Sequence, residues 1–115
     1  MKAIEKRRQQ REELIERARV YAAALDDSLA VRAVVVFGSV ARGDFNVWSD
    51  IDVLVIAKNL PERLFDRFSA VLHGKFPGIS PVAWTPEELQ VQRRKRNAIA
   101  AEADERGVVV RGELP

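Results

Sequence analysis

Four residues between two apolar runs could bind phosphate and a metal ion. Gly38 and Ser39 follow the apolar run 31–37, and Asp50 and Asp52 lie at the start of the apolar run 51–57. A glycine allows a tight turn, and the free N–H groups of a short helix over 40–42 would attract phosphate, with the serine hydroxyl as a further donor. Residues two apart in a strand share a face, so the two carboxylates are expected side by side, where Mg²⁺ carrying a nucleoside triphosphate would offset their repulsion.

The elements that must position these residues are two strands and a long helix. Both apolar runs are short and β-branched, as is typical of buried central strands. A helix is predicted over Ile4–Leu29, because this segment has no Gly or Pro and its second half repeats apolar residues at helical spacing. Three arginines of its charged first half, Arg7, Arg8 and Arg11, are expected to stay solvated.

A second amphipathic helix and a third strand are predicted next. The helix starts at Pro61 and stops at Gly74, with apolar residues at helical spacing between them. The run Gly78–Trp84 is apolar enough for a strand, and Pro81 within it favours an edge position or a bulge.

The C-terminal third predicts two more helices and a short apolar strand or tail. Thr85, Pro86 and Glu88 form the pattern of a capping box with proline at the first helical position. A break is expected near Asn97, followed by helix over 98–106 and an extended run over 108–110. The predicted fold is therefore α/β (α+β): one domain over residues 1–115, with a small mixed sheet of three to four strands backed by helices.

Composition excludes several classes of protein. The chain has 115 residues, of which 47% are hydrophobic and 31% charged, as in ordinary globular proteins. No apolar run reaches the roughly 20 residues of a membrane-spanning helix, and the charged start lacks the apolar core of a secretory signal, so we expect a cytoplasmic protein. With no cysteine and one histidine, a thiolate or multi-histidine metal site is excluded. A net charge of +2 is too small to predict nucleic-acid binding.

The spacing of the four residues resembles a known signature. Gly38-Ser39, ten residues, then Asp50-x-Asp52 is similar to the motif of the polymerase-β-type nucleotidyltransferase superfamily. The stretch GSVARGD…SDIDVLV looks most like the minimal nucleotidyltransferases, small proteins often paired with a HEPN-domain partner in toxin–antitoxin operons. The long first helix, the TPEEL helix and the closing GVVV run also resemble the family pattern.

The resemblance implies transfer of a nucleoside monophosphate from an NTP, usually ATP, to a hydroxyl, with release of pyrophosphate. Gly38 and Ser39 would hold the β- and γ-phosphates, and Asp50 and Asp52 would bind Mg²⁺ or Mn²⁺ and form the catalytic pair. If the chain resembles its closest family in function, it is the antitoxin that adenylylates a HEPN toxin, and the helix over Ile4–Leu29 is a docking surface for that partner.

One part of the family pattern is missing. The family places a third carboxylate on a later strand, but the strand Ile79–Trp84 contains no acid, and Glu87 and Glu88 lie past it in a capping turn. A two-metal site short of one carboxylate holds the second ion poorly and lacks a base. Two functions therefore stay open: adenylyl transfer to a partner protein, or a degenerate module that binds NTP or a partner with little or no catalysis.

Two further residues near the motif have alternative interpretations. Arg42 is a candidate nucleotide-binding residue, and it could equally pair with Asp44 or Asp50. Trp48 could stack on a base at the rim of the site or close the core from a loop.

The remaining candidates favour structural roles. His73 is at a helix end, where a cation interacts favourably with the helix dipole. This structural role is favoured over a catalytic one. The basic run 93–96 could contact RNA, but a solvated helix face is the favoured interpretation. We expect an NTP and a HEPN-type protein, or a second copy of the chain, as partners, with nucleic acid not favoured and no membrane.

Overall fold

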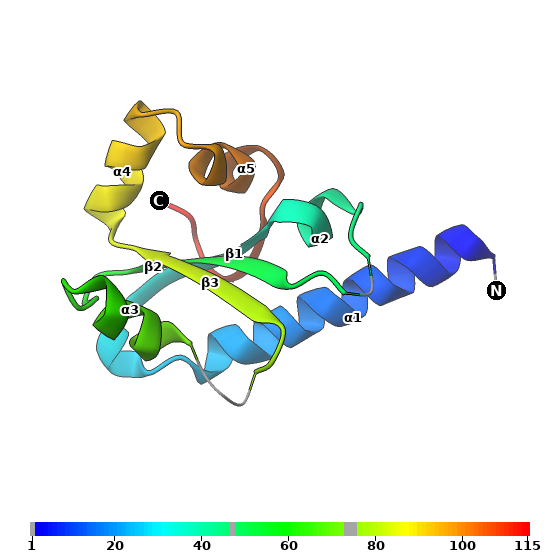
Figure 1. Cartoon of the computed structure of the whole chain (residues 1–115), viewed down its shortest axis with the longest axis horizontal. Helices are drawn as coiled ribbons and strands as arrows, with labels where there is room; N and C mark the ends of the chain where they lie inside the picture. Colours follow the sequence, from blue (N-terminus) through cyan, green and yellow to red (C-terminus); the bar gives the residue numbers. More distant parts are fainter. Residues whose placement is uncertain (1, 47, 73–75) are drawn as a thin grey trace.

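A four-stranded mixed sheet lies at the centre of the fold (Figure 1). The computed structural model describes residues 2–46, 48–72 and 76–115. The strand order is β3-β2-β1-β4, and the strands are β1 Val31–Phe37, β2 Ile51–Ala57, β3 Ile79–Trp84 and β4 Val108–Gly112. β1 is antiparallel to β2 and to β4, whereas β2 and β3 are parallel. The mixed sheet confirms the predicted fold class.

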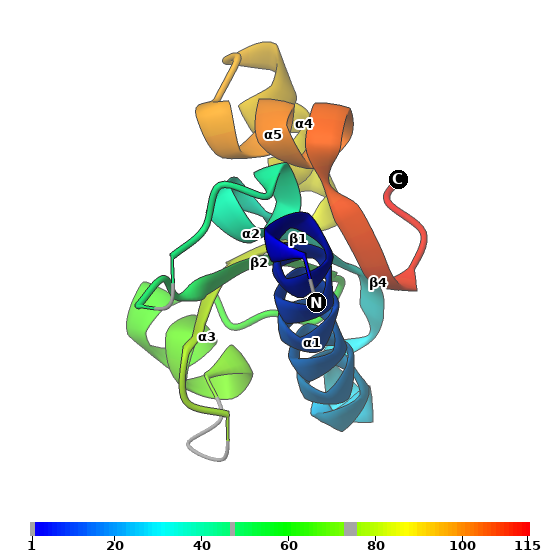
Figure 2. The same cartoon turned by 90° about the vertical axis from the view of Figure 1, so that its right-hand side faces the viewer.

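Helices cover both faces of this sheet. They are α1 Ala3–Ala24, α2 Gly38–Arg42, α3 Leu64–Val71, α4 Pro86–Arg94 and α5 Ala98–Arg106, with a 3₁₀ turn, η1, over Asp27–Leu29. α1 runs along one face, and α4 with α5 lies over the other (Figure 2). The first turns of α1 project beyond the sheet (Figure 1). No helix among the described residues is long and apolar enough to span a membrane.

Alternation along the two central strands builds two apolar layers. Successive side chains of a strand point to opposite faces, so Val34, Val36, Val53 and Val55 pack on the α1 side, whereas Ala33, Val35, Leu54 and Ile56 pack on the α4–α5 side. α1 contributes the buried residues Ile15, Ala18, Tyr21 and Ala22, while Leu89 of α4 and Ala103 of α5 close the opposite layer. Both central strands are thus fixed from two sides.

The C-terminal helices begin where the sequence predicts. Thr85 Oγ1 accepts a hydrogen bond from the backbone N–H of Glu88 at 3.1 Å, and the Glu88 carboxylate accepts from the backbone N–H of Thr85 at 2.8 Å. This reciprocal capping box starts α4. Asn97 Oδ1 accepts from the N–H of Ile99 at 2.8 Å and starts α5, which confirms the predicted break.

The boundaries of two longer predicted helices were wrong. The first helix ends at Ala24 rather than at Leu29, because Leu25 is extended and Asp26 accepts a hydrogen bond from the N–H of Ser28, which begins η1. The second helix begins at Leu64 rather than at Pro61. The carbonyl of Pro61 is bound by the Arg67 side chain at 2.9 Å, so the chain enters α3 through a turn held by that arginine.

β3 lies at the edge of the sheet, as the proline in its sequence predicts. Pro81 has no N–H to offer another strand. Nη1 of Arg67 donates to the carbonyl of Ala83 at 3.3 Å, so that acceptor is also occupied. The free edge of β3 is therefore poorly suited to pairing with a further strand.

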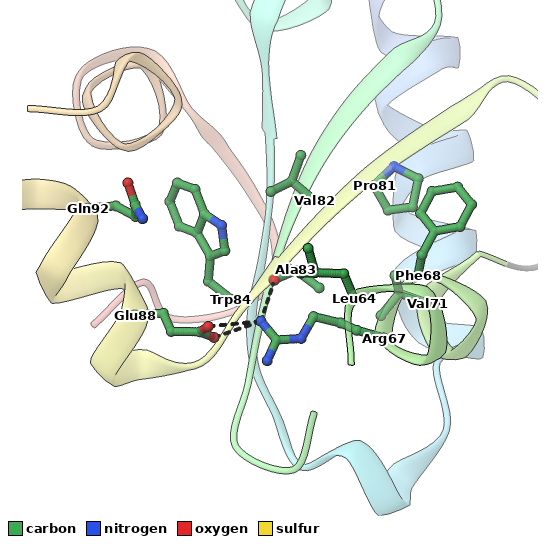
Figure 3. Close-up of a pocket in the computed structure, with 10 residues that line it drawn as sticks. All are labelled: Leu64, Arg67, Phe68, Val71, Pro81, Val82, Ala83, Trp84, Glu88 and Gln92. Atoms are coloured by element: carbon green, nitrogen blue, oxygen red, sulfur yellow. Dashed lines mark hydrogen bonds and ion pairs between the residues drawn. The ribbon is translucent and has the colours of Figure 1, made fainter. Parts of the chain in front are cut away.

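The apolar side of α3 is largely exposed. Leu64 and Phe65 are 79% and 76% exposed, and within α3 only Arg67 and Val71 are buried. An open groove lies between α3, β3 and α4, with Phe68 on one side and Trp84 on the other (Figure 3). The periodicity predicted an amphipathic helix, but most of its apolar face is not covered by the rest of the chain.

Candidate functional site

The end of β1 and the start of β2 bring Gly38 against Asp52. Phe37, the last residue of β1, pairs with Asp52 in the antiparallel register, so Gly38 turns away from the sheet beside this carboxylate. Gly38 has φ +70°, and a Cβ added there would lie 3.2 Å from Cγ of Asp52 and closer still to its Oδ2. The position thus needs glycine both for its conformation and for the close approach of the carboxylate.

Ser39 lies in the first turn of α2, directly after this glycine. The predicted helix over 40–42 begins earlier, at Gly38, and ends where Gly43 adopts φ +89°. The Ser39 carbonyl accepts from the N–H groups of Gly43 at 2.8 Å and of Asp44 at 3.1 Å, which closes the helix. Ser39 is half-buried beside the Gly38–Asp52 contact.

The two aspartates occupy different environments at the start of β2. Asp50 precedes the strand and is exposed, whereas Asp52 is half-buried within it. By the alternation of the strand, Asp52 shares its face with Leu54 and Ile56, which pack toward α4 and α5. The predicted pair therefore consists of one exposed carboxylate and one set into the sheet.

The surroundings of Asp52 disfavour its negative charge. Burial raises the pKa of Asp52 above its ordinary value, and the charges of Asp50 and Glu102 raise it further, while Arg42 acts in the opposite direction. Such a carboxylate is stabilised in its charged form by a nearby cation. The electrostatics of this position therefore suit a cation-binding site.

β3 places a serine beside Asp52. In the parallel register Ser80 pairs with Asp52, so the residue beside the buried carboxylate is neutral. Two acids follow the strand. Glu87 is exposed, and Glu88 accepts hydrogen bonds from Thr85 and Arg67. Among the described residues, no three acidic or histidine side chains are grouped so that they could hold a metal ion by themselves. A metal at Asp50 and Asp52 would therefore need further oxygen ligands, from water or from a substrate.

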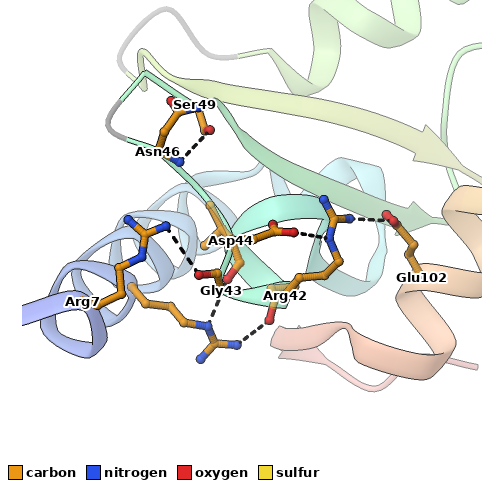
Figure 4. A network of polar contacts seen from close by, with 10 residues as sticks. Arg7, Arg42, Gly43, Asp44, Asn46, Ser49 and Glu102 are labelled. Carbon is orange, nitrogen blue, oxygen red and sulfur yellow. Dashed lines mark hydrogen bonds and ion pairs between the residues drawn. The ribbon is translucent and has the colours of Figure 1, made fainter. Parts of the chain in front are cut away.

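Arg42 extends from α2 into a set of ion pairs (Figure 4). Its Nε lies 3.2 Å from Oδ2 of Asp44, as one predicted alternative has it, and its Nη1 lies 2.7 Å from Oε1 of Glu102 on α5. Glu102 was missed by the sequence analysis, because it lies 60 residues from Arg42 and belongs to no motif. The only signal for it was its position on the polar side of a predicted helix.

Two arginines of α1 contact the C-terminal end of α2 and the segment that follows it. Arg11 donates from Nε to the carbonyl of Val40 at 3.0 Å and from Nη2 to that of Ala41 at 2.8 Å. Arg7 places its guanidinium 3.8 Å from the centre of the Phe45 ring. The prediction that these two arginines stay solvated was wrong, because the last carbonyls of a helix lack partners within it and favour a cation. Only Arg8 is exposed as expected.

The other candidates lie apart from these contacts. Trp48 is 89% exposed in the loop before β2, so the alternative in which it closes the core is wrong. Arg93, in the basic run, pairs with Asp104 of α5 through two contacts at 3.0 and 2.7 Å, while residues 94–96 are exposed. His73 lies outside the described residues.

Comparison with known proteins identifies the family. Residues 7–110 match the model of the nucleotidyltransferase domain. The chain belongs to this family. The match includes the turn at Gly38, both aspartates and α5, and it confirms the resemblance seen in the sequence.

Two individual proteins are similar to this nucleotidyltransferase domain. A Methanocaldococcus jannaschii protein named "Putative protein adenylyltransferase MJ1305" is 37% identical over 67 residues, which cover 52% of this chain and 46% of that protein. The chain thus matches about half the length of this relative. A crystal structure from Sulfolobus solfataricus, described as that of a "putative nucleotidyltransferase", shares the fold with a TM-score of 0.62 and 23% identity, over 90% of this chain and 84% of that one.

Proposed function

We propose that this nucleotidyltransferase domain binds a magnesium–NTP complex and transfers the nucleoside monophosphate to a hydroxyl of a partner protein. The observation that carries the proposal is the contact of Gly38 with the Asp52 carboxylate, which leaves no room for a side chain between the turn and the acid. The turn would contact the β- and γ-phosphates through Gly38 and Ser39, and Arg42 is the last residue of the helix that this turn begins. ATP is the proposed donor, since the M. jannaschii relative is named an adenylyltransferase.

The residues present fit a divalent cation that takes its remaining ligands from a nucleotide and from water. Asp50 and Asp52 would be its protein ligands, and phosphate oxygens would complete its shell, which is how Mg²⁺ commonly binds in phosphoryl-transfer sites. The bound ion would supply positive charge for the phosphates and for the reacting oxygens. Burial and the charge of Asp50 disfavour ionised Asp52 in the empty chain, so binding of the ion relieves an unfavourable interaction.

The transfer requires an acceptor aligned with the α-phosphate. The hydroxyl oxygen of the acceptor attacks the α-phosphorus, the bond to the bridging oxygen breaks, and pyrophosphate leaves while the hydroxyl proton passes to a base or to water. This chain would position the phosphates and the cation. The acceptor is proposed to be a HEPN-type protein, as the resemblance to minimal nucleotidyltransferases implies, with a second copy of the chain as the other candidate.

A second function has an observation of its own in favour. The family pattern places a third carboxylate on this strand, but β3 carries no acid and Ser80 is the residue beside Asp52. The chain therefore has no acid on β3 to activate the acceptor. A module that binds NTP but transfers it slowly or not at all is consistent with this substitution. A carboxylate from the partner could restore transfer in the complex.

Calorimetric titration with ATP, GTP, CTP and UTP, with and without Mg²⁺, tests the nucleotide binding that both functions require. We expect Mg²⁺-dependent binding that is lost in the double variant D50N/D52N and kept in D27N, which neutralises an exposed aspartate in η1. ATP labelled at the α-phosphate then tests transfer to the partner. Binding without transfer, even in the complex, would favour the binding module, and absence of binding would contradict both functions.

A further inference from the structure

Glu102 connects α5 to the candidate nucleotide site. It lies on the helix that packs against α2, and its Oε1 is 2.7 Å from Nη1 of Arg42. It follows the motif by fifty residues, and its contact with Arg42 joins α5 to the helix that begins at Gly38. The sequence motif contains no residue that could take its place on this side of Arg42.

The guanidinium of Arg42 is held on two of its three nitrogens. Nε binds Asp44 and Nη1 binds Glu102, on different elements, so the plane of the group is fixed (Figure 4). Within the part of the chain that the structure describes, Nη2 of Arg42 has no hydrogen bond. A guanidinium carries five N–H donors in a rigid fork, so donors remain for a further anion while both carboxylates stay bound.

The location of Arg42 makes phosphate the natural anion for these donors. Arg42 is three residues beyond Ser39 in the same short helix, and that helix begins at the glycine that lies against Asp52. A triphosphate bound between the Gly38 turn and Asp52 would thus lie within the field of Arg42. Charge-assisted contacts of arginine to phosphate are among the stronger hydrogen bonds in proteins.

We infer that Glu102 is a positioning residue for nucleotide binding, which fixes Arg42 so that its free donors face the phosphates of the NTP. This inference rests on the proposed function, because it concerns how Arg42 serves the same site. It predicts that α5, outside the sequence motif, sets the affinity of the domain for its nucleotide.

The chain offers a matched control on the same helix. Asp104 also pairs with an arginine, Arg93, at 2.7 Å, and its side chain is 38% exposed compared with 37% for Glu102. Arg93 is on α4 and does not contact the motif residues. E102A and D104A therefore each remove one half-exposed ion pair from α5, but only E102A releases Arg42.

The test is a double-mutant cycle on Mg·ATP affinity, measured by calorimetry with E102A, D104A, R42M and E102A/R42M. We expect E102A to weaken binding about tenfold, the size of one charge-assisted hydrogen bond, and D104A to bind as the wild type does. In the R42M background, E102A should cause no further loss, because Glu102 acts through Arg42.

Nitrogen NMR of the Arg42 side chain, in the nucleotide-free protein, gives a second readout. Slow rotation of the guanidinium is expected in the wild type and in D104A, and faster rotation in E102A. Unchanged or tighter binding by E102A would overturn the inference, as would an equal loss in the R42M background or an Arg42 that already rotates freely. If wild type binds Mg·ATP and R42M binds equally well, only this inference fails; if wild type does not bind, the proposed function fails with it.

Discussion

Two arginine–glutamate pairs in this chain have similar contact distances and different surroundings. Arg67 of α3 lies 2.8 Å from Glu88 of α4, and Arg42 of α2 lies 2.7 Å from Glu102 of α5. Arg67 has a side-chain exposure of 10% and also donates to two backbone carbonyls, whereas Arg42 is 33% exposed and, among the described residues, donates to carboxylates alone.

The surroundings of each pair determine whether it can respond to a ligand. Nε and Nη1 of Arg67 donate to Pro61, Ala83 and Glu88, and Glu88 in turn caps α4, so this pair can change only if the surrounding fold changes. A half-exposed pair contributes little to folding stability. We therefore assign stability to the pair of α3 and α4, and nucleotide binding to the pair of α2 and α5.

The largest expected effect is the loss of stability in E88A. The substitution leaves Arg67 buried without its counter-charge and removes the capping box of α4, so we expect the free energy of unfolding to fall by about 3 kcal/mol. Urea denaturation measures this value, with E87A, at the exposed neighbouring position, as the control. A loss no greater than that of E87A would break the comparison.

R67M should cost less than E88A, although it removes the same pair. The remaining Glu88 carboxylate is 42% exposed and can be hydrated, and the methionine side chain fills part of the buried space. We expect a loss of about 1–2 kcal/mol, chiefly from the unbonded carbonyls of Pro61 and Ala83. A larger loss in R67M than in E88A would show that the arginine is not the costly partner to leave alone.

Acid should lower the folding stability of the wild type more than that of E88Q. We expect this difference to be smaller than the loss caused by E88A or R67M. Burial alone would raise the pKa of Glu88, but the hydrogen bond from the backbone of Thr85 and the contact and charge of Arg67 outweigh it and lower the pKa below its usual 4.5. The unfolded state therefore takes up this proton first, and the stabilisation present above pH 4.5 is lost as the pH falls through the lower, folded-state pKa. Urea midpoints between pH 7 and pH 3 should fall less steeply in E88Q, and parallel curves would contradict this role of Glu88.

The smallest expected change is the stability of E102A. Its pair is half-exposed on both sides, so the urea midpoint should match that of the wild type within error, in low and in high salt. The same variant is expected to weaken Mg·ATP binding. Loss of the Arg67–Glu88 pair should thus lower stability, whereas loss of the Arg42–Glu102 pair should lower nucleotide affinity. A midpoint of E102A as low as that of E88A would show that both pairs serve the fold.

Local patterns predicted the elements well. The β-branched runs gave β1 and β2 with their observed boundaries, and the caps at Thr85 and Asn97 gave the starts of α4 and α5. These features depend on neighbours a few residues apart, so the sequence contains their cause. The Gly38 turn and the two aspartates belong to the same class, because their spacing and the two strands around them are local.

The supports of the site could not be predicted in the same way. The bonds from Arg11 to α2 join residues 29 and 30 apart, and the bond from Arg42 to Glu102 joins residues 60 apart. Such partners are set by how α1 and α5 pack on the sheet, which the local pattern does not encode. The exposure of α3 was missed for a related reason: periodicity shows that a helix has an apolar face but not whether the rest of the chain covers it.

The occupied edge of β3 affects how copies of this chain can associate at high concentration. An open strand edge recruits further strands, and repeated recruitment leads to fibrils with backbone bonds between copies. At β3 the proline offers no donor and Arg67 occupies the carbonyl of Ala83, so growth of the sheet in this direction is opposed. Contacts between copies on this side would instead use the exposed apolar side chains of α3, and an association made by such side chains alone is reversed by dilution.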